Sequence, residues 1–180
     1  MLTSVTITHL QMFSRDRLRP RPKPRPDVAV DRVAEPSPEI NRFFYIAIGG
    51  DWHWRDRLPW SDADWKFYVE RPAFETWVVR VGDDLAGFFE LERQSGGDVE
   101  IVYFGLLPAF VGNGLGGWAL SEAIDRAWAG GANRVWVHTC DLDHPAALGN
   151  YLARGFEVYK AEVTQEDLPD VVPHAMSAER

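Results

Sequence analysis

Four glycines within six residues, Gly112, Gly114, Gly116 and Gly117, are the feature that most limits how this chain folds. They follow an apolar run that ends near Leu107, and they precede a segment in which apolar residues recur at helical spacing. Glycine lets a backbone approach a ligand closely, and the start of a helix presents free N–H groups and a positive dipole end. The pattern therefore predicts a strand-to-helix turn that binds an anion, with a phosphate or a diphosphate as the natural ligand.

The same glycines have a second interpretation, because Gly112, Gly114 and Gly117 also fit the G-x-G-x-x-G pattern of dinucleotide-binding folds. In those folds the glycines directly follow the first strand of a parallel unit, and several strands come after it. Here a linker that includes Pro108 intervenes, and little of the chain remains after Asp141, the candidate ribose ligand. A domain that binds NAD is therefore the less favoured alternative, and a tight turn without any ligand is another.

The rest of the chain predicts a single domain over 1–180 that mixes helices and strands. Short Gly/Asp connections at 82–84 and 94–98 predict an antiparallel meander of three strands. Strands are expected at 3–13, 28–34, 74–81, 85–93, 99–107, 132–140 and 155–163. Helices are expected at 38–48, 62–71, 113–129 and 144–154. Ser37 and Ser61 are the expected N-caps of the first two helices. These elements predict an α+β fold, with a mixed, mostly antiparallel sheet of six or seven strands flanked by about four helices.

The net charge of the chain, −8, is unevenly distributed. Residues 15–26 carry a net charge of +5, so the rest of the chain carries −13. The basic residues alternate with prolines in a predicted loop at 14–27, which favours an extended connection over a nucleic-acid site. The acidic remainder also argues against nucleic acid as the main partner.

The compartment is indicated by features that the sequence lacks. No apolar run approaches the roughly 20 residues that span a bilayer. The N-terminal segment alternates like a strand and has neither the basic start nor the apolar stretch of a signal peptide. A lone cysteine, Cys140, leaves no internal disulfide and suits a reducing compartment. We therefore expect a cytoplasmic protein, a monomer or homodimer, without a membrane partner.

Two motifs give the chain a resemblance to a known family. The first is Q/R-x-x-G-x-G/A at the start of a helix, which 111–116 match with Val111 in place of the usual Gln or Arg. The second is N-x-x-A-x-x-x-Y-x-x-x-G-F, which 144–156 match with His144 in place of Asn. The matching positions of the second motif are Ala147, Tyr151, Gly155 and Phe156. Over about 74–159 the chain therefore resembles the GNAT superfamily of coenzyme A-dependent N-acetyltransferases.

The resemblance implies a three-layer fold and transfer of an acetyl group from acetyl-CoA to an amine of a small molecule or peptide, by direct attack in a ternary complex. Because Val111 and His144 depart from the motifs, a non-catalytic acyl-CoA-binding module is the alternative function. A backbone N–H near Leu106 or Leu107 is the expected oxyanion donor, at a strand bulge that Gly105 would allow. The residues expected to bind coenzyme A are Leu106, Leu107, Val111, Gly112, Asn113, Gly114, Leu115, Gly116 and His144.

Amide formation from a thioester needs a base for the amine and an acid for the departing thiolate. The resemblance implies Tyr151 as the general acid, and a tyrosine of the core is the competing interpretation. Glu100 and Glu90 compete as the general base. Glu100 resembles the glutamate that serves as base in GNAT histone acetyltransferases, and strand alternation places it on one face with Val102 and Phe104. Glu90 lies among apolar residues, where burial favours the protonated form. We favour Glu100.

An aromatic segment before the meander is the expected acceptor side. Trp52, Trp54 and Arg55 are the candidate substrate-binding residues, because aromatic rings bind amines and arginine binds carboxylates. Packing of these rings on the sheet is the competing interpretation, and it is at least as well supported for Trp60 and Trp65. No histidine has a second ligand at metal-binding spacing, so no metal site is expected.

Overall fold

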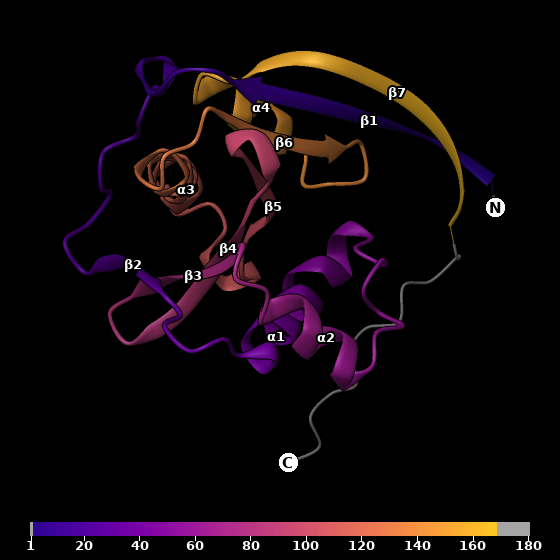
Figure 1. The fold of residues 1–180 in the computed structure, drawn as a ribbon, viewed down its shortest axis with the longest axis horizontal. Helices are drawn as coiled ribbons and strands as arrows, with labels where there is room; N and C mark the ends of the chain where they lie inside the picture. Colours follow the sequence, from indigo (N-terminus) through magenta and orange to yellow (C-terminus); the bar gives the residue numbers. More distant parts are fainter. Residues whose placement is uncertain (1, 169–180) are drawn as a thin grey trace.

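The computed structural model describes residues 2–168, which contain a seven-stranded sheet in the order β2-β3-β4-β5-β6-β1-β7 (Figure 1). The strands are β1 (Leu2–Met12), β2 (Val28–Arg32), β3 (Phe74–Val81), β4 (Asp84–Arg93), β5 (Asp98–Leu106), β6 (Arg134–Cys140) and β7 (Glu157–Asp167). Neighbouring strands are antiparallel except β5 and β6, which are parallel. The predicted mixed sheet and the antiparallel meander β3–β4–β5 are confirmed. The described residues do not form the parallel sheet that a dinucleotide-binding fold requires.

The helices of this part of the chain cover both faces of the sheet. They are α1 (Pro38–Gly49), α2 (Asp62–Val69), α3 (Leu115–Ala129) and α4 (Ala147–Ala153). Val78 and Phe88 pack against Phe44 of α1, whereas the next residues along the strands, Val79 and Phe89, belong to the core under α3 and α4. Because successive side chains of a strand point to opposite faces, α1 and α2 cover one face and α3 and α4 the other (Figure 1). The expected three layers are confirmed.

Serine caps fix the N-termini of α1 and α2, as the sequence predicts. Ser37 Oγ accepts a hydrogen bond from the Ile40 N–H at 3.4 Å. Ser61 Oγ accepts one from the Asp64 N–H at 3.2 Å, and the Asp64 carboxylate accepts one from the Ser61 N–H at 2.8 Å. Such a cap contributes about 1 kcal/mol to helix stability. No helix within residues 2–168 is long and apolar enough to cross a membrane.

The N-terminal strand β1 lies between β6 and β7, although these strands come from the other end of the chain. His9 of β1 pairs with His138 on one side and with Lys160 on the other. Alternation in the sequence predicts the strand but not its neighbours. β1 pairs with one edge of β6, and the other edge of β6 faces β5.

A β-bulge in β5 changes the register of the meander. Glu90 of β4 lies opposite two residues, Val102 and Tyr103. The pairs on either side are Phe89–Phe104 and Leu91–Ile101. The bulge expected near Gly105 is therefore wrong in position. Gly105 serves close packing instead, since a Cβ there would lie 2.7 Å from Cγ2 of Ile48.

The bulge also corrects the predicted face of β5. Glu100, Val102 and Phe104 do not share one face, because the extra residue reverses the alternation that follows it. Tyr103 packs on the side of α1 and α2, and Phe104 packs against the core under α3. Glu100 lies before the bulge, so alternation counted along the sequence could not predict which of the later side chains share its face.

Candidate active site

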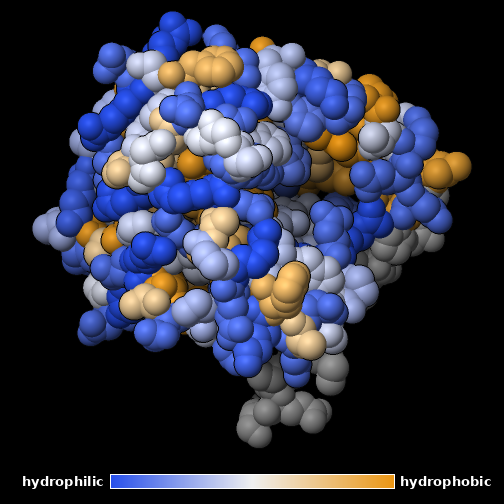
Figure 2. Space-filling view, in the orientation of Figure 1, coloured by the Kyte–Doolittle hydropathy of each residue, from blue (hydrophilic) through white to orange (hydrophobic). Residues whose placement is uncertain are grey.

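The parallel strands β5 and β6 pair only at their first residues. Glu100 and Trp136 form the last pair, and the strands then separate. A cavity of about 850 Å³ lies in this gap, between 102–106 of β5 and 137–140 of β6. The glycine turn, α4 and the segment between α1 and α2 complete its wall. Figure 2 shows a partly apolar hollow in the surface between the sheet strands and these helices. The volume is that of a site for a small molecule or cofactor.

The glycine turn forms one end of the cavity. Gly112 and Gly114 have φ values of +85° and +75°, in the left-handed region that favours glycine. Gly114 is the N-cap of α3 and provides no capping side chain, unlike the serines at α1 and α2. The first N–H groups of α3 therefore lack a side-chain acceptor at the wall of a cavity. This arrangement fits the diphosphate of a cofactor.

The structure brings most of the predicted cofactor-binding residues to this cavity. Those that line it are Leu106, Val111, Gly112, Gly114, Gly116 and His144. Leu107, Asn113 and Leu115 do not line it. Leu115 is a core residue with 2% of its surface exposed, and the Asn113 side chain donates to the Ala109 carbonyl at 3.5 Å.

The end of β5 offers a free peptide edge. The Leu107 N–H donates a hydrogen bond of 2.8 Å to the Ala86 carbonyl of β4. Peptide groups alternate in direction along a strand, so the Leu106 N–H points away from β4 and toward the gap. Of the two predicted oxyanion donors, Leu106 is thus the one whose N–H faces the cavity.

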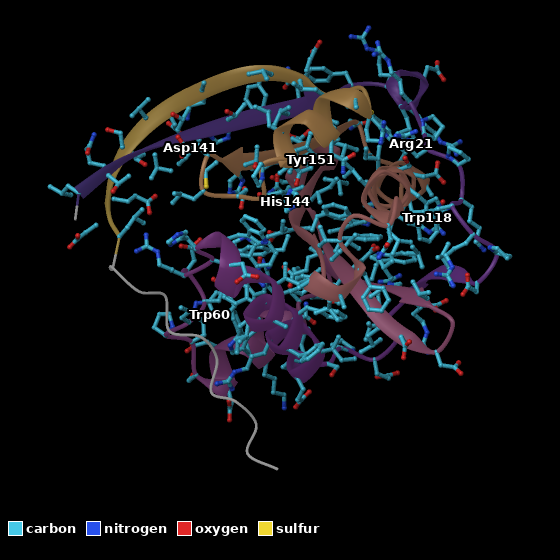
Figure 3. All side chains as sticks on the ribbon, turned by 180° about the vertical axis from the view of Figure 1, so that it is seen from behind. Arg21, Trp60, Trp118, Asp141, His144 and Tyr151 are labelled. Carbon is cyan, nitrogen blue, oxygen red and sulfur yellow. The ribbon has the colours of Figure 1, made fainter. Side chains whose placement is uncertain are left out.

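Tyr151 extends from α4 to the cavity wall and is 7% exposed. Its ring packs edge-on against Phe156, with centroids 6.1 Å apart. Burial, and then the charge of Asp143, raise the pKa of the phenol above its usual value. The hydroxyl, like that of an unperturbed phenol, carries its proton at neutral pH. Figure 3 shows Tyr151 near His144, with Arg21 farther along beside α3.

Glu100 lies where β5 and β6 separate, and it is 8% exposed. Its carboxylate accepts a hydrogen bond from Gln94 Nε2 at 3.0 Å and lies 3.4 Å from His138 Nδ1. His138 lines the cavity, whereas Glu100 does not. The hydrogen bond with Glu100, together with the charges of Asp143 and Asp56, raises the pKa of His138 against the opposing effect of burial. The arrangement presents an imidazole to the cavity with a carboxylate behind it.

Glu90 is fully buried and does not line the cavity. Its Oε1 accepts hydrogen bonds from Asn41 Nδ2 at 2.7 Å and from Arg57 Nη1 at 2.9 Å, and its Oε2 lies 2.9 Å from Arg57 Nη2. The Asn41 side chain in turn accepts a hydrogen bond from Thr76 Oγ1 at 3.0 Å. The structure thus places Glu90 in a buried ion pair, and its role as a base stays a prediction.

The Arg57 guanidinium lies among five aromatic rings, whose centroids are 4.3–5.8 Å from its Cζ. The rings are those of Tyr45, Trp60, Trp65, Tyr68 and Tyr103. Burial alone would lower the pKa of Arg57, but the charge of Glu90 outweighs it and raises that pKa. This cation–π cluster is therefore occupied by a cation of the chain itself, which supports the packing interpretation for Trp60 and Trp65.

The three predicted substrate-binding residues all line the cavity. Trp54 Nε1 donates a hydrogen bond of 3.3 Å to Asp143, and the Trp52 ring lies 4.8 Å from the ring of His144. Arg55 pairs at 2.6 Å with a glutamate of β7. The contacts of Trp54 and Trp52 tie the segment after α1 to the loop after β6, and the contact of Arg55 ties it to β7.

Other residues that line the cavity belong to no motif of the sequence, among them Arg21, Asp56, His138 and Arg154. Arg21 stands in the loop that the sequence predicts to be a plain connection. The other three share no spacing that relates them to the glycine turn, so only the fold brings them together. Among residues 2–168, no three histidine, cysteine, aspartate or glutamate side chains form a cluster that could hold a metal ion.

Solved structures similar to this chain include several acetyltransferases. A GCN5-related N-acetyltransferase from Kribbella flavida shares 22% identity and a TM-score of 0.64 over 92% of this chain and 58% of that chain. One from Sphaerobacter thermophilus shares 15% identity and a TM-score of 0.66 over 91% of this chain and 52% of that chain. An acetyltransferase from Bacillus subtilis, in complex with CoA, shares 22% identity and a TM-score of 0.55 over 74% and 78%. At these identities the likeness shows a common fold.

The family assignment comes from a match of the sequence to a family model. No curated protein sequence matches the chain significantly. The model of the acetyltransferase (GNAT) family, however, matches residues 36–156, which include α1, the meander, the glycine turn and α4. The chain spans little more than half the length of the Kribbella flavida and Sphaerobacter thermophilus proteins. Since the match covers more than half of this chain and the fold agrees with it, the chain belongs to the GNAT acetyltransferase family.

Proposed function

We propose that this chain, as a single domain over 1–180, transfers an acetyl group from acetyl-CoA to an amine of a small molecule or peptide. The observation that carries the proposal is an uncapped, glycine-rich helix start that opens into a cavity between two separating strands. Backbone N–H groups of 112–116 would hold the diphosphate, and the free edge of β5 at Leu106 would take the pantetheine arm as an added strand. The similar Bacillus subtilis acetyltransferase in complex with CoA supports this assignment.

Two groups on the cavity wall suit the breakdown of a thioester. Attack by the amine turns the acyl carbonyl into an oxyanion, for which the Leu106 N–H is the donor. When the carbon–sulfur bond breaks, the Tyr151 hydroxyl donates its proton to the thiolate. A phenol is protonated at neutral pH, and burial of Tyr151 keeps it so.

His138 and Glu100 suit the removal of the amine proton. His138 lines the cavity and accepts the proton, and Glu100 positions the imidazole and stabilises its charged form. Asp56 and Asp143 also line the cavity, and Asp143 accepts a hydrogen bond from Trp54, so their negative charge attracts a protonated amine before it loses its proton. Glu100 then acts through His138 and is a positioning residue.

Titration with coenzyme A and a thiol-release assay test the proposed function. Calorimetry is expected to show binding of coenzyme A, and acetyl-CoA is expected to release free thiol only when an acceptor amine is present. Binding of coenzyme A without turnover across a broad panel of amines would favour the non-catalytic acyl-CoA-binding module. No heat with coenzyme A at millimolar concentration would reject both functions.

Replacing Glu100 with glutamine is expected to shift the acid limb of the kcat/KM profile to lower pH. The active form of His138 is the neutral imidazole, which is present above its pKa. Glu100 raises that pKa, so loss of the carboxylate lowers it and extends activity toward acid. The measurement is kcat/KM for the amine across pH with saturating acetyl-CoA.

The matched control is Glu92→Gln, since Glu92 lies opposite Glu100 in β4 and pairs with Arg71 outside the cavity. Its profile is expected to keep the acid limb of the unmodified protein. If Glu100→Gln instead loses activity at every pH, Glu100 itself is the base, and the role given to His138 is wrong.

A further inference from the structure

The basic proline-rich loop lies against α3 and α4. The Arg21 N–H donates a hydrogen bond of 2.9 Å to Ser121 Oγ in α3. Arg19 and Arg154 exchange two hydrogen bonds of 2.9 Å, from the Arg19 N–H to the Arg154 carbonyl and from Arg154 Nε to the Arg19 carbonyl. A Cβ at Gly155, where φ is +105°, would lie 2.0 Å from a carbonyl oxygen of the loop. These contacts hold the loop in a defined place beside the start of α3.

Arg21 and Arg154 bring their side chains to the same point of the cavity wall. Both approach Gly117, where a Cβ would lie 2.6 Å from Arg154 Nη1 and 3.0 Å from Arg21 Cγ. Because Gly117 has no side chain, the two cationic groups can lie over the first turn of α3. Figure 3 shows Arg21 beside this helix, on the side toward Tyr151.

No carboxylate neutralises these two arginines within residues 2–168. Three of the other four arginines of the loop do have carboxylate partners: Arg15–Asp125, Arg17–Glu157 and Arg25–Asp27. Arg154 is 8% exposed, and its guanidinium donates to neutral acceptors, the Arg19 carbonyl and the Asn150 side chain. Burial and the like charge of Arg21 lower the pKa of Arg154. An anion at this point would offset the repulsion between the two cations.

We propose that Arg21 and Arg154 bind a phosphate group of coenzyme A beside the first turn of α3. The proposal rests on the proposed function, in which the N–H groups of this turn face the diphosphate. Val111 brings no charge to the turn, and the planar donor groups of arginine match the oxygens of a phosphate. Coenzyme A offers two such groups, the diphosphate and the adenosine 3′-phosphate, and one set of titrations separates them.

Calorimetric titration of Arg21→Ala with coenzyme A is expected to give about tenfold weaker binding than the unmodified protein, as for loss of one charge-assisted contact. The backbone bond of residue 21 to Ser121 is retained, so the loop keeps its place. The control is Arg19→Ala, which removes the same charge from the same loop outside the cavity. Arg154→Gln can still donate to the Arg19 carbonyl, and it is expected to weaken binding as well, with its melting temperature reporting whether the fold is kept.

A second titrant, 3′-dephospho-coenzyme A, identifies the phosphate. If Arg21→Ala weakens its binding equally, the arginines hold the diphosphate, and if the loss disappears, they hold the 3′-phosphate. Either result supports the proposal. Binding of coenzyme A by Arg21→Ala that is no weaker than binding by Arg19→Ala overturns it and leaves the proposed function intact. Failure of the unmodified protein to bind coenzyme A overturns both.

Discussion

Replacing Glu90 with glutamine is expected to lower the free energy of unfolding by about 3–5 kcal/mol, because Arg57 then stays charged in a buried site without a counter-charge. Glu90 is 0% exposed and Arg57 is 4% exposed. Glutamine keeps the size of the side chain and an acceptor oxygen for Asn41, so the change isolates the effect of the charge. The measurement is the denaturant midpoint and slope of unfolding, followed by tryptophan fluorescence.

The control for this prediction is Glu70→Gln, which removes a carboxylate of the same type from an exposed pair. Glu70 lies 4.0 Å from Lys66 one helical turn earlier, and both side chains are exposed. Its loss is expected to change the free energy of unfolding by less than about 0.5 kcal/mol. If Glu90→Gln unfolds like the unmodified protein but has lost turnover, then Glu90 is the base, and the ion pair is not its main role.

The elements of the fold that the sequence predicts are those with local causes. Ser37 and Ser61 mark the starts of α1 and α2, because the side chain and the N–H that it accepts from lie three residues apart. The place of β1 has no local cause. Its alternation predicts a strand, but the same pattern would suit other positions in the sheet. Its neighbours, β6 and β7, are more than a hundred residues away in the sequence.

The same distinction separates the predicted from the unpredicted parts of the site. The glycine turn is predictable, because the positive φ values at positions 112 and 114 favour glycine, and the glycines are visible in the sequence. Arg21 is not, because it meets Ser121 across a sequence separation of 100 residues. The bulge at Val102 and Tyr103 is not either, since neither residue type signals an irregular strand. One extra residue was enough to reverse the face of every side chain after it.

Replacing Tyr151 with phenylalanine is expected to lower kcat by roughly a hundredfold or more, as for loss of a general acid. Phenylalanine keeps the ring that packs against Phe156 in the core and removes only the hydroxyl. The departing thiolate then loses the hydroxyl of Tyr151 as its proton donor, whereas the groups that bind coenzyme A are unchanged. The measurement is thiol release at saturating acetyl-CoA, with calorimetry to show that the affinity for coenzyme A is retained.

The pH dependence and a matched control decide whether the hydroxyl acts as an acid. An acid is active in its protonated form, which is present below its pKa, and burial raises the pKa of Tyr151. Activity of the unmodified protein should therefore show no basic limb from this group in the neutral range. Tyr159→Phe, on β7 and outside the cavity, is expected to keep full turnover. If Tyr151→Phe also keeps full turnover, Tyr151 is a residue of the core, and the thiolate leaves without a proton from the protein.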